Sequence, residues 1–472
     1  MQPTQIEAEG SAFQAAAAYT PRRRTAALIA VALAFVMDLV DTTIVNVALP
    51  SIDNDLGAGP AALEWIVAGY AIAFSVLLIV GGRLGDSQGY KRMFLLGIVL
   101  FTAASLCCGA ATSMHMLDIG RLLQGASAAL MVPQVMALVQ VMYPPEQRHK
   151  VYATFGFLGG FSAALGPIIG GLLIEANWFD LGWRLAFLIN LPIGLISVVA
   201  GALMLPAGRS VHPVRVDWGG TLLTIAVALA ILLPLIEGPS LHWPWWSVAA
   251  LLAAAPLAWL TARYLVWRDR KHDDALVRPA LLRQRRVALG LLCCLCINPI
   301  IPGYLLVMTL VLQGGYGLSA SQMAYACAPI ALGAMLGISL LGPRLHKRLG
   351  VRAVIPGVLA QMIGLCVLGW TVNQAALPQW ALIVGQLCMG LGLGLSGPPL
   401  SNVTLQDVPL RDAGVASGLL TAVQQMAGAL GVALGGLLYF HGGGNAGVQF
   451  LHTLPLFLGL LGCGLLVLKR ID

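Results

Sequence analysis

Residues 36–50 of the chain read VMDLVDTTIVNVALP and lie in an apolar run that begins after three arginines at 22–24. A helix of about 25 residues, at ~1.5 Å per residue, is roughly 37 Å long and can cross a bilayer with some tilt. Two carboxyl groups interrupt this run, and an ionisable residue at such a depth costs about 2.5–3.5 kcal/mol on insertion scales. Asp38, Asp41, Thr42 and Asn46 share one side of the helix by their three- and four-residue spacing. The pattern predicts a membrane-spanning helix with a protonatable stripe that lines a pathway.

The composition indicates a polytopic membrane protein. Of the 472 residues, 58% are hydrophobic and 10% are charged, whereas soluble proteins carry about 25% charged residues. The net charge of +7 does not predict nucleic-acid binding, because the basic residues lie in short loops and there is no basic soluble domain. The nine cysteines fall in apolar runs without metal-ligand spacing, so neither a metal site nor a disulfide framework is expected. Residues 1–24 do not have the pattern of a cleavable signal peptide.

Apolar runs of spanning length recur along the chain and predict fourteen membrane helices. After the first, they lie near 62–82, 93–112, 116–142, 151–174, 184–205, 217–236, 244–266, 287–312, 321–342, 352–372, 378–405, 413–438 and 446–468. With both termini in the cytoplasm, all 27 lysines and arginines except Arg121 and Arg184 lie on the inner side, as the positive-inside rule requires. We therefore expect a multi-pass protein of the cytoplasmic (inner) membrane with both termini cytoplasmic.

A weak internal repeat, offset by about 261–265 residues, predicts the domain organisation. Three pairs of segments match in order: 82–91 with 343–352, Gly120-Arg121 with Gly385-Gln386, and Gly166-x-x-x-Gly170-Gly171 with Gly431-x-x-x-Gly435-Gly436. The predicted fold is an all-α membrane protein of two six-helix bundles, related by a pseudo-twofold axis, with two inserted helices. The expected boundaries are a cytoplasmic tail at 1–24, a bundle at 25–205, the inserted helices and a linker at 206–286, and a second bundle at 287–472. Two such halves around a central site suit alternating access.

Four motifs carry a resemblance to a known family. They are Asp41-x-Thr43-Ile44-Val45-Asn46-Val47-Ala48-Leu49-Pro50, the loop Gly82 to Arg92, Arg121-x-x-Gln124-Gly125, and Gly166-Pro167-x-x-Gly170-Gly171. Their order and spacing resemble those of the fourteen-spanning drug:proton antiporters of the major facilitator superfamily. Three features depart from that pattern: Ser87 and Tyr90 stand at loop positions that are often basic, Gln424 stands where relatives often carry arginine, and the run at 287–312 contains no acid. These departures argue against a dicationic substrate and against a second proton site.

Asp41, Asp38 and Arg121 are the predicted proton-coupling residues. Desolvation raises the pKa of a carboxyl group and a nearby cation lowers it, so such a group can exchange a proton for substrate as the cavity alternates. Arg121 and Asp41 are expected at similar depths, which would let the arginine bias the aspartate. The alternatives are a packing role for the aspartates and a local pair between Arg121 and Asp118.

The resemblance implies conformational roles for two further motifs. Gly82, Asp86, Gly89, Lys91 and Arg92 would form a latch in which Asp86 pairs with a neighbouring base; the alternative is a plain cytoplasmic turn. The other motif comprises Gly166, Pro167, Gly170 and Gly171. It would permit close helix contact and a bend, and ordinary small-residue packing is its alternative.

The predicted function is proton-coupled export of lipophilic, neutral or monocationic compounds by alternating access, that is, multidrug efflux. Asn46, Gln124, Asn298, Tyr304 and Gln425 are tentative substrate contacts, and the proton is the only coupling ligand, without cofactor or metal. The expected partners are a small-molecule substrate and membrane lipid, with no nucleic acid, and the protein is expected to work as a monomer. One alternative is a dedicated exporter or symporter of one metabolite, such as an antibiotic, a siderophore or an amino acid. A membrane-embedded enzyme is a remote alternative, because no convergent set of catalytic residues lies at membrane depth.

Overall fold

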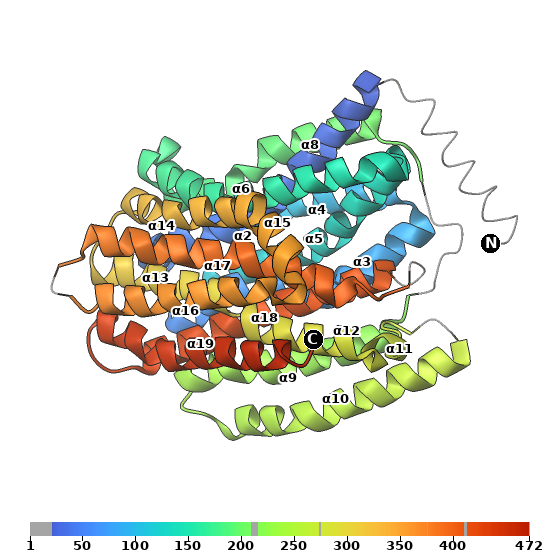
Figure 1. The fold of residues 1–472 in the computed structure, drawn as a ribbon. Coiled ribbons are helices and arrows are strands. Elements are labelled where there is room, and N and C mark those ends of the chain that lie inside the picture. Colours follow the sequence, from blue (N-terminus) through green and yellow to red (C-terminus); the bar gives the residue numbers. More distant parts are fainter. Residues whose placement is uncertain (1–20, 209–215, 273–274, 375, 410–412, 472) are drawn as a thin grey trace, which may run out of the picture.

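The computed structural model describes residues 21–208, 216–272, 275–374, 376–409 and 413–471, so most of the predicted tail at 1–24 lies outside it. Within these ranges every regular element is a helix, and the long helices run roughly parallel through the molecule (Figure 1). The elements up to the linker are α2 Pro21–Leu56, α3 Pro60–Gln88, α4 Tyr90–Gly109, α5 Met114–Met142, α6 Pro145–Ala176, η1 Trp178–Asp180, η2 Gly182–Arg184, α7 Leu185–Leu188, α8 Asn190–Met204, α9 Trp218–Ser240, α10 Trp245–His272 and α11 Pro279–Arg283. The others are α12 Arg285–Ile297, α13 Ile300–Thr309, η3 Leu310–Gly315, α14 Ala320–Met335, η4 Leu336–Leu341, α15 Gly342–Leu349, η5 Gly350–Ala353, α16 Val354–Thr371, α17 Gln379–Leu405, α18 Ala413–His441 and α19 Ala446–Leu468.

The described residues contain twelve helices that are long and apolar enough to cross a membrane, or thirteen if one bent pair counts as a single span. The predicted count of fourteen is therefore not reproduced. One of the twelve is a continuous helical run of 52 residues, Ala320–Thr371, which includes α14, α15 and α16. The run is not one straight α-helix, because Gly350, which follows α15, has a φ of 56°. Its 52 residues are more than the about 20 residues needed to cross a bilayer once.

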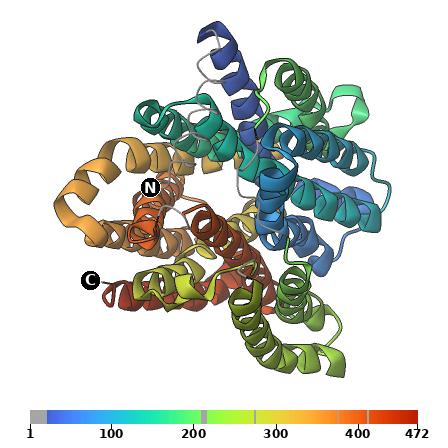
Figure 2. The same ribbon diagram turned by 90° about the vertical axis from the view of Figure 1, so that its right-hand side faces the viewer.

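Each half of the chain forms its own set of packed helices. In the first half α5 packs between α3 and α4, and in the second half α17 packs between α14 and α16. The two halves meet along two seams, α6 with α14 and α3 with α18. Helix α9 contacts both α3 and α18, and α10 packs on α9 at the edge of the molecule, as Figure 2 shows.

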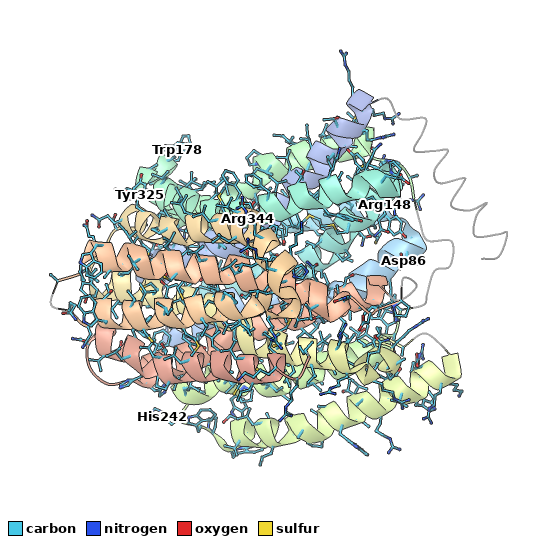
Figure 3. All side chains as sticks on the ribbon, in the orientation of Figure 1. Asp86, Arg148, Trp178, His242, Tyr325 and Arg344 are labelled. Atoms are coloured by element: carbon cyan, nitrogen blue, oxygen red, sulfur yellow. The ribbon has the colours of Figure 1, made fainter. Side chains whose placement is uncertain are left out.

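The two ends of the bundle differ in how closely the halves pack. One end, which we call the basic end, carries the α3–α4 and α5–α6 connections with Asp86 and Arg148; the opposite end carries Trp178 and His242 (Figure 3). Toward the opposite end, residues 44–49 of α2 are each at most 5% exposed, so protein surrounds the helix on all sides. Toward the basic end the same helix exposes Ile29 to 54%. Protein therefore encloses α2 at the opposite end.

Helix α6 is bent by 41° between its segments Glu146–Ser162 and Leu165–Ala176. Pro167 lies just beyond the bend. A proline has no backbone N–H and its ring displaces the carbonyl four residues earlier, which here falls at the bend. The bend expected at this motif is therefore present.

Candidate functional site

An ion pair between α2 and α5 lies in the interior of the first half. Arg121 Nη1 is 2.5 Å from Asp41 Oδ2, and the side chains are 1% and 0% exposed. The predicted proximity of the two residues is found, and the alternative pair with Asp118 is not, since the buried Oδ1 of Asp118 has no hydrogen-bond partner. A buried pair of this kind is strongly destabilised when one partner is removed, because the other charge is left uncompensated.

Asp41 is further held by a network of neutral side chains. Its Oδ1 accepts hydrogen bonds from Gln124 Nε2 at 3.0 Å and from Asn190 Nδ2 at 2.8 Å. Both amides also donate to Ser105 Oγ, at 2.8 and 3.2 Å. Helices α2, α4, α5 and α8 thus all contribute to one polar cluster. Both carboxyl oxygens are satisfied, as a buried carboxylate requires.

The guanidinium of Arg121 is fixed from three further directions. Its Nε donates to the Ile66 carbonyl on α3 at 2.8 Å, and its Nη1 donates to Gln124 Oε1 at 2.9 Å. Its central carbon lies 4.6 Å from the centre of the Tyr70 ring and 5.9 Å from that of Phe187. A planar fork stacked on an aromatic face is a role that lysine cannot reproduce.

Asp38 lies one turn away and belongs to the same cluster. Its Oδ1 accepts a hydrogen bond from the Tyr70 hydroxyl, and Asp38 is 4% exposed. Tyr70 therefore connects the two carboxyl groups, because its ring faces Arg121 and its hydroxyl faces Asp38. The cluster holds two carboxyl groups and one base, so it is electrically balanced only when one carboxyl group carries a proton.

The polar stripe on α2 does not line a passage in this conformation, contrary to the expectation from its spacing. Asp38 and Asp41 are buried inside the first half. Thr42 Oγ1 donates to the Leu39 carbonyl, and Asn46 Nδ2 donates to the Thr42 carbonyl, so both side chains bond to their own helix. The two aspartates of this face are turned toward the helices of their own bundle.

A small apolar cavity of about 50 Å³ lies between the two halves. Its lining is Thr43 on α2, Gly160 and Pro167 on α6, Ile301 and Leu305 on α13, Cys327, Ile330, Ala331 and Ala334 on α14, and Leu393 on α17. Drug-sized ligands occupy pockets of about 300–1,000 Å³. The cavity must therefore widen before it can hold such a compound.

The second half contains a neutral counterpart of the ion pair. Tyr304, offset by 263 residues from Asp41, donates its hydroxyl hydrogen to Gln386 Oε1 at 2.6 Å, and both residues are 0% exposed. Gln386 occupies the place that the internal repeat assigns to Arg121. The same helix contact is thus made with charges in one half and without them in the other.

The five tentative substrate residues are not brought together. Gln124 and Tyr304 use their polar groups for buried bonds within their own halves, and Asn298 Nδ2 donates to the Cys294 carbonyl at 3.1 Å. Asn46 bonds along α2, and Gln425 is half-buried on α18. Among the described residues that line the cavity, none of the five occurs. The sequence reveals which side chains are polar, but not which of their bonds are already satisfied.

The loop motif lies at the basic end, and the carboxylate–base latch expected there stays a prediction. Asp86 accepts a hydrogen bond from the Tyr90 hydroxyl at 3.0 Å, and Lys91 Nζ donates to the Ala202 carbonyl at 2.7 Å. Gly89 has a φ of 107°, a left-handed value that favours glycine. Gly82 faces Pro133 on α5. Arg92 lines a surface pocket of about 500 Å³ with Lys91.

Arg83 connects this loop to the linker. Its guanidinium donates to the Ala275 carbonyl and, at 3.2 Å, to the Leu276 carbonyl, and the residue is 7% exposed. The contact ties the first half to the segment before α11. Arg83 was expected only as one of the positive-inside charges.

The glycines of α6 allow close contacts with two neighbouring helices. A methyl group at Gly166 or Gly170 would overlap Thr43 or Ile44 on α2. A methyl group at Gly171 would lie 2.7 Å from the Ala324 methyl group on α14. Gly166 and Gly170 thus face the first half and Gly171 faces the second. This motif lies where the two halves would move against each other.

Four functional-site residues were missed by the sequence analysis: Tyr70, Ser105, Asn190 and Arg83. Asn190 could have been found from the sequence, because it is a lone amide in the apolar run at 184–205. Tyr70 and Ser105 could not have been found in this way, since their place in the polar cluster depends on which helices are neighbours. No group of three or more metal-ligating side chains occurs within the described ranges.

Comparisons with known proteins agree with this architecture. The Major Facilitator Superfamily model matches residues 31–432. A protein described as a probable actinorhodin transporter from Streptomyces coelicolor is 39% identical over 420 residues, which cover 89% of this chain and 73% of that protein. A puromycin resistance protein from Streptomyces alboniger is 34% identical over 418 residues, 87% of this chain and 81% of that protein.

Solved structures share the fold at low sequence identity. A crystal structure of an auto-inhibited peptide transporter of the POT family has a TM-score of 0.67 at 18% identity, covering 95% of this chain and 97% of that one. The xylose transporter XylE from E. coli has a TM-score of 0.62 at 15% identity, covering 94% and 98%. At these identities the likeness concerns the fold alone. The chain belongs to the major facilitator superfamily and is a multi-pass membrane transporter, not an enzyme.

Proposed function

We propose that the protein is a proton-coupled antiporter that exports lipophilic, neutral or monocationic compounds. Export is supported by its relatives, which include a tetracenomycin C resistance and export protein from Streptomyces glaucescens, 30% identical over 415 residues. An apolar substrate is supported by the cavity, whose lining offers the Thr43 hydroxyl and the Cys327 thiol as its only polar side chains among the described residues. The observation that carries proton coupling is the buried cluster of Asp41, Arg121 and Asp38.

Coupling proceeds through helix packing rather than through direct exchange at one carboxylate. Substrate in the cavity would not touch Asp41, which is fully buried on the other side of α2. Thr43, two residues along the same helix, lines the cavity and packs on Gly166. Protonation of Asp41 would weaken its pair with Arg121 and let α2 shift, which would reshape the cavity at Thr43.

The topology belongs to the same proposal. The run Ala320–Thr371 makes two passes, α14 and α16, with basic α15 between them, which with the bent α6 gives fourteen spans. In this proposal two bundles, at 25–205 and 287–472, rock about the cavity. The inserted helices at 206–286 attach at one seam. Both termini lie in the cytoplasm. The segment Gly82–Arg92 restrains one conformation at the basic end. The protein works as a monomer in the cytoplasmic membrane, with lipid as its surroundings.

The test is efflux from vesicles with an imposed pH gradient. Asp41→Asn keeps the shape of the side chain but cannot carry a proton, so we expect proton-driven efflux to be abolished while the protein remains folded. Tyr304→Phe is the matched control, because it breaks the equivalent contact in the second half without removing a carboxyl group or a permanent charge. Unchanged efflux by Asp41→Asn, or equal loss in both variants, would remove Asp41 from the coupling step.

A dedicated exporter of one metabolite is the second candidate. It is favoured by the relative with 39% identity, which is named for a single compound. Thermal stabilisation of the purified protein across a panel of compounds separates the two candidates. One strong response would indicate a dedicated exporter, and many weak responses would indicate multidrug export.

A further inference from the structure

Glu64 is a buried acid that the sequence analysis did not single out. It lies in the first turns of α3, at the opposite end of the bundle from the basic end, and is 3% exposed. Its Oε2 is buried without a hydrogen-bond partner. Ionisation of a carboxyl group in such a position is costly, because neither water nor a donor compensates the charge.

The carboxyl group of Glu64 lies at the seam between the halves. It contacts Gly436 on α18 so closely that a methyl group at position 436 would overlap it. Helices α3 and α18 form one of the two seams. A carboxyl group is therefore part of the close packing of this seam.

The other seam makes the equivalent contact without an acid. Gly171, which the repeat pairs with Gly436, packs against Ala320 and Ala324 in the first turns of α14. Ala324 is the fifth residue of α14, as Glu64 is the fifth residue of α3. A methyl group is enough to close that seam, so close packing alone does not require a carboxyl group.

The surroundings of Glu64 are acidic. Titratable and charged side chains toward this end of the helices packed on α3 are Asp53 and Asp55 on α2, Cys107 and Cys108 on α4, His115, Asp118 and Arg121 on α5, Glu237 on α9, and Tyr439 and His441 on α18. Glu237, another acid, lies on α9, which packs on α3. Glu237 accepts a hydrogen bond from Trp65 Nε1 at 2.7 Å. Two arginines lie near this end, and both are paired elsewhere: Arg184 with Asp55 at 2.7 Å and Arg121 with Asp41 at 2.5 Å.

We propose that Glu64 is a second proton-binding site, and that the α3–α18 seam closes only around its protonated form. Loss of the proton would place an uncompensated charge between the halves, next to Glu237, and the seam would open to hydrate it. This inference extends the proposed transport cycle. When the α3–α18 seam is open, Glu64 would exchange its proton with the water outside; when the seam is closed, Glu64 would hold the proton. The dependence of the seam on protonation can be measured without transport.

Hydrogen–deuterium exchange of the full-length protein in lipid nanodiscs tests the proposal. Peptides from 60–70 and 430–441 are compared between wild type and Glu64→Gln between about pH 5 and pH 9. Glutamine mimics the protonated acid, so we expect equal exchange at low pH and faster exchange in wild type as pH rises. The ratio of the two rates should increase by up to about tenfold per pH unit, the limit for release of one proton. A ratio that stays constant over this range would overturn the proposal.

Two further variants make the result specific. Glu237→Gln is the matched control and should keep the pH dependence, so a loss of that dependence would assign the proton to Glu237 instead. Gly436→Ala should speed exchange at every pH by holding the seam apart, and unchanged exchange would show that the contact does not control closure. Peptides from the α6–α14 seam report on folding and should not change in Glu64→Gln. If efflux fails to depend on Asp41 while this seam still responds to pH, the proposed function fails and the inference survives.

Discussion

Arg121 combines a charge with a fixed geometry, and two substitutions separate these properties. Arg121→Lys keeps the charge but leaves the Ile66 carbonyl without its donor, which should lower the free energy of unfolding by about 1–3 kcal/mol. Arg121→Gln copies the second half, where Gln386 stands at this position. We expect the lysine variant to retain weak pH-driven efflux and the glutamine variant to lose it, as measured in vesicles together with thermal unfolding. Full efflux by the glutamine variant would show that the charge is not needed.

For single side chains, the sequence predicted which groups belong to the polar cluster better than it predicted which neighbours they face. Asp41, Arg121 and Gln124 were identified from motif and depth, and they meet in the structure. The stripe on α2 was expected to face a passage, because a helical period shows only that residues share a face. Whether that face meets water or another helix depends on long-range packing. Asn190 completes the cluster from 149 residues away, and no local pattern could indicate that.

Among the elements, α6 offers a direct test because its bend and its proline coincide. Pro167→Ala restores a backbone donor and should straighten the helix, raising the free energy of unfolding by at most about 3 kcal/mol. Because Pro167 lines the cavity and Gly166 packs on α2, we expect slower efflux despite the added stability. Pro256→Ala on exposed α10 is the control and should leave efflux unchanged. Equal efflux by wild type and Pro167→Ala would show that the bend does not serve transport.

The apolar runs predicted where helices lie along the chain. They did not predict where each helix begins and ends, or how many helices of spanning length the structure contains. The runs predicted at 321–342 and 352–372 fall within one helical stretch, since α15 continues α14 instead of ending it. The basic residues of α15 break the hydrophobic pattern without breaking the backbone hydrogen bonds. Sequence periodicity measures polarity, and a polar segment can remain helical when it leaves the membrane core.

The cavity between the two halves is small, so one larger side chain in its lining should fill it. Ala334 on α14 is 2% exposed and lines the cavity, so Ala334→Phe would fill space that the halves share. Such overpacking costs about 1–3 kcal/mol, which a protein of this size can tolerate. We expect efflux of every tested compound to be lost, because the variant occupies the common site rather than one subsite. The measurement is efflux of a chemically varied panel from vesicles with an imposed pH gradient.

Leu332→Phe is the control for this prediction, since Leu332 lies on the same helix and is 59% exposed. It adds a similar ring on the outer face of α14 and should leave efflux intact. If Ala334→Phe blocks some compounds and spares others, the halves provide separate subsites and the cavity is only one of them. If both variants transport normally, the substrate path avoids the interface between the halves. Rocking of two bundles about this cavity would then no longer describe how the transporter works.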